Sequence, residues 1–437
     1  MLIPQLTEYD PVTLSEGSLD PLGLYSIADK MGVLLAPGIR ERQLHPLFLT
    51  AIAACTHICS EFDDDTVAND GVSKPWQVCE WYVVEAITRK AKNNSEIRGL
   101  PGRQKAQASI ESGMGLSAAR YLKTPSVFGF HGVYRLLART LDIIDNYDRL
   151  GANGYELLAV WQAEQNLPGF LSGSTGRGRA FLDRMRVAVE IGLKAGKTTR
   201  SSGWAGWTEI FHYLRHTRKP EGESSLIRQW LTKGESRLLA EIYGCLLSRR
   251  GRALWLDSAG SEQAFHRFAR EGCSPDLGEL IDGIADYERF CWAVLKAFNA
   301  TLSVLSDRQL GAKLSEISDN RHVVEAAATA SELYYAAEQS LAPLGFAVEF
   351  ERSFGAFVES MPPADWLETL IRHHERVQKA KPPAGKLPWI DRFSNGTVFV
   401  RPPYQQESLP DVPDEDLYVH QYRTNSLWSF AFDLGMV

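Results

Sequence analysis

The sequence predicts a mainly α-helical protein of several modules with a small amount of β structure, and three observations support this. The chain has 437 residues, more than one hydrophobic core usually serves. It is 44% hydrophobic and 23% charged, which is ordinary globular usage. Apolar residues recur at spacings of three and four along most of its length, whereas a convincing strand pattern occurs only near the C-terminus.

The first hundred residues are predicted to form an acidic helical module. Apolar spacing predicts helices over residues 21–36, 40–62 and 76–90, the second of them bent at Pro46. The polar stretch KNNSEIRGLPGRQK then marks a boundary near residue 100. Residues 1–100 are therefore assigned to the first module.

The charge is unevenly distributed along the chain, although its total is only −7. Residues 1–88 carry a net −9, residues 89–237 a net +11, and residues 238–437 a net −9. The basic middle section fits a surface that faces phosphates, or a module that docks on the chain's own acidic neighbours. The first interpretation requires its cations to gather in space and to stay open to an outside polyanion.

Within this basic section the pattern predicts a short helix at 116–122, a helix at 132–141, a turn, and a helix at 152–165. The order resembles a winged helix-turn-helix over about residues 103–166, with the phrase RLLARTLDIID…DRLGANGYELL carrying the likeness. The resemblance implies a winged-helix-like α+β module at residues 101–172. It also implies that the 132–141 helix enters the major groove of DNA, although winged helices serve as protein-docking modules too.

A second basic helical module is predicted at residues 173–256, with helices at 181–193, 204–215 and 226–247. The segment Gly196-Lys197-Thr198-Thr199 lacks the spacing and the preceding strand of a nucleotide-binding P-loop, so it is assigned to a solvated basic turn. Together the two modules supply the predicted nucleic-acid-binding residues, which are Arg103, Lys105, Arg120, Lys123, His131, Arg135, Arg139, Arg177, Arg179, Lys197 and Arg200.

Residues 257–437 are predicted to form a C-terminal helical bundle with a hairpin and a tail. Ser274-Pro275-Asp276 is a strong helix start, and the long apolar stripe after it needs a partner. Helices at 323–341 and from Pro363 could supply that partner, as could a second copy of the chain. Asn395-Gly396 predicts a hairpin over residues 389–401, and the aromatic C-terminal tail is expected to pack on the body or on another subunit.

No catalytic residue, metal ligand or cofactor is assigned from the sequence. Asp63-Asp64-Asp65, Asp70, Glu80 and Glu85 leave open a metal-dependent nuclease, but the lysine that such sites place beside an acid on a strand is missing. Cys55, His57, Cys59 and Cys79 lie on an apolar helical pattern that favours core packing over zinc. His373-His374-Glu375 lacks the H-E-x-x-H spacing and is assigned to helix surface.

The stretches DPLGLYSIADKMGVLLAPGI and LPGRQKA…ARYLKTPSVFGFHGVYRLLART are similar to bacterial proteins of phage-defence gene clusters. This resemblance implies a non-catalytic adaptor subunit that binds DNA or RNA and assembles with other proteins in a complex. A protein-only scaffold and the metal-dependent nuclease are the alternatives. The acidic N-terminal residues and the absence of a long apolar run predict a cytoplasmic protein with no membrane partner.

Overall fold

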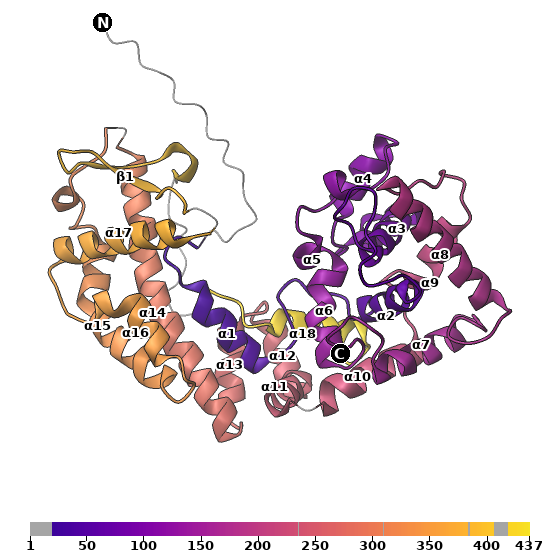
Figure 1. The fold of residues 1–437 in the computed structure, drawn as a ribbon. Helices are drawn as coiled ribbons and strands as arrows, with labels where there is room; N and C mark the ends of the chain where they lie inside the picture. Colours follow the sequence, from indigo (N-terminus) through magenta and orange to yellow (C-terminus); the bar gives the residue numbers. More distant parts are fainter. Residues whose placement is uncertain (1–19, 235, 309, 383–384, 406–417) are drawn as a thin grey trace, which may run out of the picture. The chain divides into compact units, whose positions relative to one another are not determined.

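The computed structural model describes residues 20–234, 236–308, 310–382, 385–405 and 418–437. In these residues it contains eighteen α-helices and one two-stranded antiparallel sheet near the C-terminus, so the prediction of a mainly α protein with a small hairpin is confirmed (Figure 1). Among the helices of the described ranges, none combines the length and the apolarity that a membrane span requires.

The chain forms two compact units, which we name after their central helices. The α14 unit comprises the described residues up to 31 and those from 261 to 421, and the α3 unit comprises residues 32–260 and 422–437. The predicted boundary near residue 257 lies close to the division at 260/261. The predicted boundaries near residues 100 and 172 fall inside the α3 unit, where helices from both sides of them pack together.

The α3 unit is organised around helix α3, which contacts α2, α4, α8 and α9 (Figure 1). Nearly every side chain from Val78 to Ile87 is buried, so the helix is enclosed on all sides. Helix α1 (Tyr25–Leu35) spans the division between the units. The other helices of the α3 unit are α2 (Phe48–Cys59), α3 (Pro75–Lys90), α4 (Arg103–Glu111), α5 (Pro125–Phe128), α6 (Phe130–Thr140), α7 (Ala152–Glu164), α8 (Arg177–Ala195), α9 (Gly206–Leu214), α10 (Glu221–Lys233), α11 (Arg237–Leu247), α12 (Arg249–Asp257) and α18 (Thr424–Asp433).

The α14 unit is a helical bundle in which α14 packs along α15, and α15 packs against α17. As predicted, the Ser274 hydroxyl caps α14 by accepting from the Leu277 amide at 3.4 Å. Its elements are α13 (Glu262–Arg270), α14 (Pro275–Ser306), α15 (Arg321–Leu341), α16 (Ala347–Phe354), α17 (Pro363–Ala380), β1 (Ile390–Arg392) and β2 (Val398–Val400). The predicted hairpin is confirmed, with Gly396 in the left-handed conformation at its turn (φ +84°).

Two predicted helices differ from the structure. The stretch 116–122 forms only a 3-10 turn, Ala118–Arg120, because the amide and carbonyl of Leu116 bond to Thr198 and keep the chain extended there. The predicted 226–247 helix is two helices, α10 and α11, and the Ser236 hydroxyl caps the second by accepting from Leu239.

The aromatic C-terminal tail packs on the body of the protein, as predicted. It forms α18, in which Leu427 and Phe430 are buried, and Tyr422 just before it is buried as well. The Ser426 hydroxyl donates to the Arg40 carbonyl at 2.8 Å, which joins α18 to a loop of the same unit.

Candidate nucleic-acid interface

Two segments of the α3 unit bring basic residues together on one face, which we call the cationic face. Residues 89–123 and 194–200 carry eleven basic and two acidic side chains. Ser117 and Lys197 form an antiparallel bridge, and the Thr198 amide donates to the Leu116 carbonyl at 2.8 Å. The two segments therefore meet, although seventy residues separate them in the sequence.

Two buried glutamates of α3 accept hydrogen bonds from these segments and so hold them against the helix. Glu85 accepts from the Thr198 hydroxyl at 2.5 Å, and this hydroxyl in turn accepts from the Leu116 amide at 2.8 Å. Glu80 accepts from the Tyr121 hydroxyl at 2.6 Å. Burial raises the pKa of the Glu80 carboxyl to about 7, against the lowering effect of its bonds to Tyr121 and to the His131 amide.

Five of the predicted binding residues are exposed on the cationic face: Arg103, Lys105, Arg120, Lys123 and Lys197. A Cβ atom on Gly102 would lie 2.4 Å from the Tyr121 ring, so the start of α4 lies against the loop that carries Arg120 and Lys123. None of the five forms an ion pair with any residue that the structure describes. Their charges remain available to solvent or to a ligand.

Arg200, a sixth predicted residue, lies beside this group but is partly buried. Its guanidinium carbon is 5.4 Å from the centroid of the Trp204 ring, which is a cation–π contact. Trp204 packs edge-on against Trp207, and Trp207 is fully buried. Trp207 thus belongs to the core of this unit.

The arginines of the predicted recognition helix are bound within the protein. Helix α6 buries most of its surface, and Arg135 and Arg139 both bond to Asp148, at 2.8 Å and 2.9 Å. A short loop closed by the bridge between Ile144 and Leu150 follows, at the place where the sequence pattern predicts a turn.

The remaining predicted cations, Arg177 and Arg179, lie at the first turn of α8, whereas Lys197 follows its last turn. A helix of 19 residues separates the two ends by about 28 Å. Arg179 is also paired with Asp183 at 2.9 Å. The structure therefore does not bring these two residues to the cationic face.

His131, one of the predicted nucleic-acid-binding residues, is not on the cationic face but is buried at the wall of a cavity of about 660 Å³. Burial lowers the pKa of its imidazole to about 4, so the ring is neutral at pH 7. Other residues of this wall, including Trp76, Tyr147 and Tyr155, were not predicted from the sequence. Tyr147, in the turn-like Asn146-Tyr147-Asp148, is 79% exposed, and an aromatic residue in a polar turn was the available signal.

The acids considered for metal-dependent cleavage have separate roles. Asp63, Asp64 and Asp65 are exposed in the loop after α2, whereas Glu80 and Glu85 are buried in α3. Asp70 accepts from the Ser73 amide and hydroxyl within its own turn. Across the described ranges, no three His, Cys, Asp or Glu side chains stand together in a group that could hold a metal ion. Cys55 and Cys79 pack in the core, as predicted.

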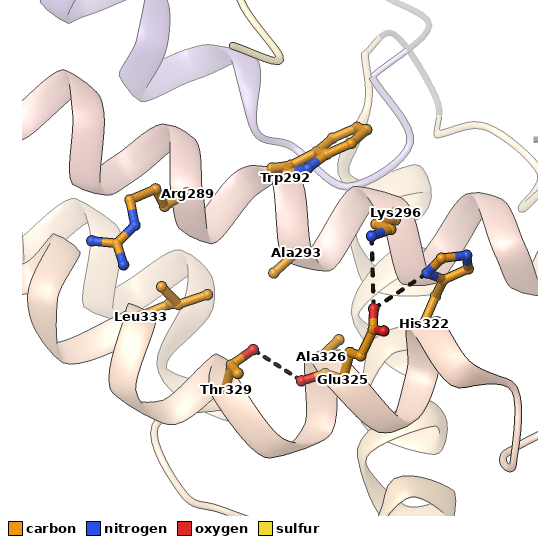
Figure 2. A pocket seen from close by; sticks show the side chains of 9 residues that line it. All are labelled: Arg289, Trp292, Ala293, Lys296, His322, Glu325, Ala326, Thr329 and Leu333. Atoms are coloured by element: carbon orange, nitrogen blue, oxygen red, sulfur yellow. Dashed lines mark hydrogen bonds and ion pairs between the residues drawn. The ribbon is translucent and has the colours of Figure 1, made fainter. Parts of the chain in front are cut away.

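The α14 unit has a smaller groove of about 260 Å³ between α14 and α15 (Figure 2). Its charged side chains largely satisfy one another, because Glu325 faces both Lys296 at 3.6 Å and His322 at 3.4 Å. Arg289, at the other end of the view, pairs with Asp286 at 3.4 Å. The α3 unit differs, because the five exposed cations named above have no such partner among the described residues.

No family model, curated protein or solved structure matches this chain. Its function therefore has to be inferred from the geometry described above.

Proposed function

We propose that this protein binds a nucleic acid through the cationic face, as a binding component of a larger assembly. The observation that supports this most directly is the set of five exposed cations that have no acidic partner among the described residues. Phosphate contacts by lysine and arginine supply most of the affinity in nucleic-acid binding, and they do not require a groove-reading helix. The proposal therefore depends on α4 and on the 116–123 loop, and not on α6.

The overall charge of −7 makes the local arrangement decisive. A chain with this charge is repelled from polyanions unless its cations are concentrated on one surface. Many other cations of residues 89–237 are neutralised internally. Arg218, for example, is buried in a two-pronged pair with Glu223, and Arg184 pairs with Glu209. Five of the cations without an ion pair among the described residues lie on the two segments that meet at the bridge between Ser117 and Lys197.

Salt titration of binding tests the proposal. Each phosphate contact contributes about −0.9 to the slope of log K against log salt for duplex DNA, and about −0.7 for a single strand. Combining Arg103→Gln, Arg120→Gln and Lys123→Gln should reduce that slope by about 2 to 3 and weaken binding at low salt. The binding constant would be measured by fluorescence anisotropy with labelled duplex and single-stranded oligonucleotides.

A matched control removes three exposed cations elsewhere in the same unit: Arg177→Gln, Lys233→Gln and Arg249→Gln. The change in net charge is identical, so the control should leave the slope unaltered if binding is local. Equal effects of the two triple variants would contradict the proposal, because they would indicate attraction to total charge alone. A slope near zero for the wild type would contradict it as well, and would favour a protein-only scaffold.

A further inference from the structure

The cavity at the start of α3 has the chemistry of a nucleotide site, and we infer that it accepts one unstacked nucleobase together with its phosphate. The cavity, of about 660 Å³, is formed by the end of α2, the start of α3, the start of α6, and the loop 145–150. Its ligand class follows from three features of the wall: an aromatic platform, open hydrogen-bond acceptors, and cations at the rim. For a base that belongs to a bound strand, the inference rests on the proposed function. For a free nucleotide it does not.

The aromatic platform consists of Trp76 and His131, whose rings stack at 4.6 Å with an angle of 22° between their planes. Tyr147 and Tyr155 add two further rings, which are 79% and 54% exposed. Exposed aromatic rings around a cavity favour a planar ligand, because every nucleobase offers a face for stacking. An aliphatic amine or a simple inorganic anion would make little use of these rings.

The open acceptors are carboxylates. Asp145 uses one oxygen, Oδ1, to accept from the amides of Tyr147 at 2.8 Å and Arg149 at 2.9 Å. No described residue bonds to its Oδ2 atom, which can therefore accept from a ligand. The Asp63 side chain makes no hydrogen bond or ion pair with any described residue. Carboxylates of this kind accept from the exocyclic amino groups of bases.

A buried nitrogen in the same wall also lacks a partner. His131 is only 3% exposed, and its Nε2 atom has no hydrogen-bond partner among the described residues. A buried polar atom without a partner is costly, so such an atom in a cavity wall points to a missing ligand.

The rim supplies cations for a phosphate group. The Lys74 ammonium lies 3.1 Å from the Asp64 carbonyl, and Arg149 pairs with the Asp64 carboxylate at 3.1 Å. The side chains of that pair are 67% and 84% exposed, and exposed pairs contribute little to stability, so Arg149 can exchange its partner for a phosphate.

One buried residue links the cavity to the cationic face. The Glu80 carboxylate accepts from the Tyr121 hydroxyl with one oxygen and from the His131 amide at 2.9 Å with the other. Tyr121 lies between Arg120 and Lys123 in the sequence, so the side chains of Tyr121 and Glu80 join the loop that carries these cations to the cavity wall. A single strand can turn a base out of the stack far more cheaply than a duplex can.

Isothermal titration calorimetry of the full chain with cytidine 5′-monophosphate, uridine 5′-monophosphate and ribose 5-phosphate tests this inference. Cytosine offers the two N–H groups of its amino group to the two carboxylates, whereas uracil has a carbonyl at that position and a single N–H at N3. The cytidine compound should therefore bind about tenfold more tightly, and the sugar phosphate should bind most weakly. Equal binding of the sugar phosphate and the cytidine compound would overturn the inference, because it would indicate a plain anion site.

Two variants with a matched control make the test specific. The double variant Asp63→Asn, Asp145→Asn removes both carboxylates. The asparagine at 145 still has an Oδ1 atom to accept from the Tyr147 and Arg149 amides, so the turn is kept, but the preference for cytidine over uridine should be abolished. Trp76→Leu should weaken both nucleotides. Asp65→Asn, in the same exposed loop but not at the cavity wall, should change neither. Circular dichroism checks that each variant is folded. If Trp76→Leu fails to fold, the double variant Asp63→Asn, Asp145→Asn still tests the inference.

The outcomes also separate this inference from the proposed function. Salt-dependent oligonucleotide binding that Trp76→Leu does not affect, together with no saturable mononucleotide binding, would overturn the inference and leave the proposed function intact. Cytidine monophosphate binding without oligonucleotide binding would support a free-nucleotide site and overturn the proposed function. A larger effect of Trp76→Leu on single strands than on duplexes would support a strand as the source of the base.

Discussion

Glu80 is a fully buried carboxyl group that accepts two hydrogen bonds but faces no cation within hydrogen-bonding distance. Burial raises its pKa to about 7 in the folded protein, against a usual value of 4.5. Between these two values the folded protein holds a proton that the unfolded chain releases. The free energy of unfolding therefore falls as pH rises through this window.

Glu80→Gln should remove this pH dependence. A glutamine can accept from the His131 amide and donate to the Tyr121 hydroxyl, so the network is retained without a titrating group. Relative to wild type, the variant should gain up to about 3 kcal/mol of stability between pH 4.5 and pH 8. Urea unfolding at several pH values measures the difference, and Glu111→Gln on the exposed surface of α4 serves as the control. A constant difference between the variant and wild type would contradict the assignment.

The prediction that His373 and His374 lie on a helix surface was wrong, because both are buried in α17. His374 donates through Nδ1 to the Pro21 carbonyl at 2.8 Å and accepts at Nε2 from the Trp389 amide at 2.8 Å. His373 bonds to the Leu22 carbonyl at 2.7 Å. These partners lie far away in the sequence, so no local spacing pattern could reveal them.

At the scale of elements, local signals predicted the structure well where they were strong. The serine, proline and aspartate at 274–276 begin α14, and Asn395-Gly396 turns the hairpin. The prediction of a short helix at 116–122 was wrong, because the hydrogen bonds between Leu116 and Thr198 outweigh the helix propensity of this stretch. The candidate site was predictable only in part: the sequence indicated the exposed cations, whereas the cavity depends on loops that meet only in the folded chain.

Helix α8 packs closely on α3 through Gly192, and this contact can be tested with a matched pair of glycines. A Cβ atom at Gly192 would lie 2.6 Å from Val78 and 3.2 Å from Tyr82, whereas one at Gly244, inside α11, would meet nothing within 4 Å. Gly192→Ala should destabilise the protein by about 1 to 3 kcal/mol through overpacking. Gly244→Ala should stabilise it by about 0.5 to 1 kcal/mol, because alanine favours a helix interior.

Thermal or urea unfolding of the two alanine variants measures whether Gly192→Ala lowers the stability and Gly244→Ala raises it. Equal effects at both positions would show that helix propensity alone governs them, and would contradict the close contact between α8 and α3.

At the scale of the whole molecule, the charge partition along the sequence correctly located a basic section but could not show which cations remain free. Whether a cation forms an ion pair depends on which acids the folded chain brings beside it. Arg135 and Arg139 share the nearby Asp148, whereas Arg184 reaches Glu209 and Arg186 reaches Glu61 across the unit. Partners that are distant in the sequence therefore reduce a section with a net charge of +11 to a smaller exposed group.

Buried histidines in both units predict that the whole protein loses stability in mild acid. Burial lowers the pKa of His131, His373 and His374 to about 4, and of His216 and His266 to about 3. The unfolded chain binds protons at these rings below about pH 6.5 while the folded protein does not, so the free energy of unfolding falls as pH falls from 6.5 to 4. Each histidine should contribute about 2 to 3 kcal/mol to this loss at pH 4.

Urea unfolding at pH 7.5, 5.5 and 4.5 should therefore give steadily lower midpoints. Because His131 and His216 belong to the α3 unit and the other three to the α14 unit, any separate transitions of the two units should both shift. Glu80 opposes this trend over part of the range, so Glu80→Gln should make the acid loss steeper than in wild type. A midpoint that stays level from pH 7.5 to 4.5 would mean that the buried rings take up protons in the folded state, contrary to their burial.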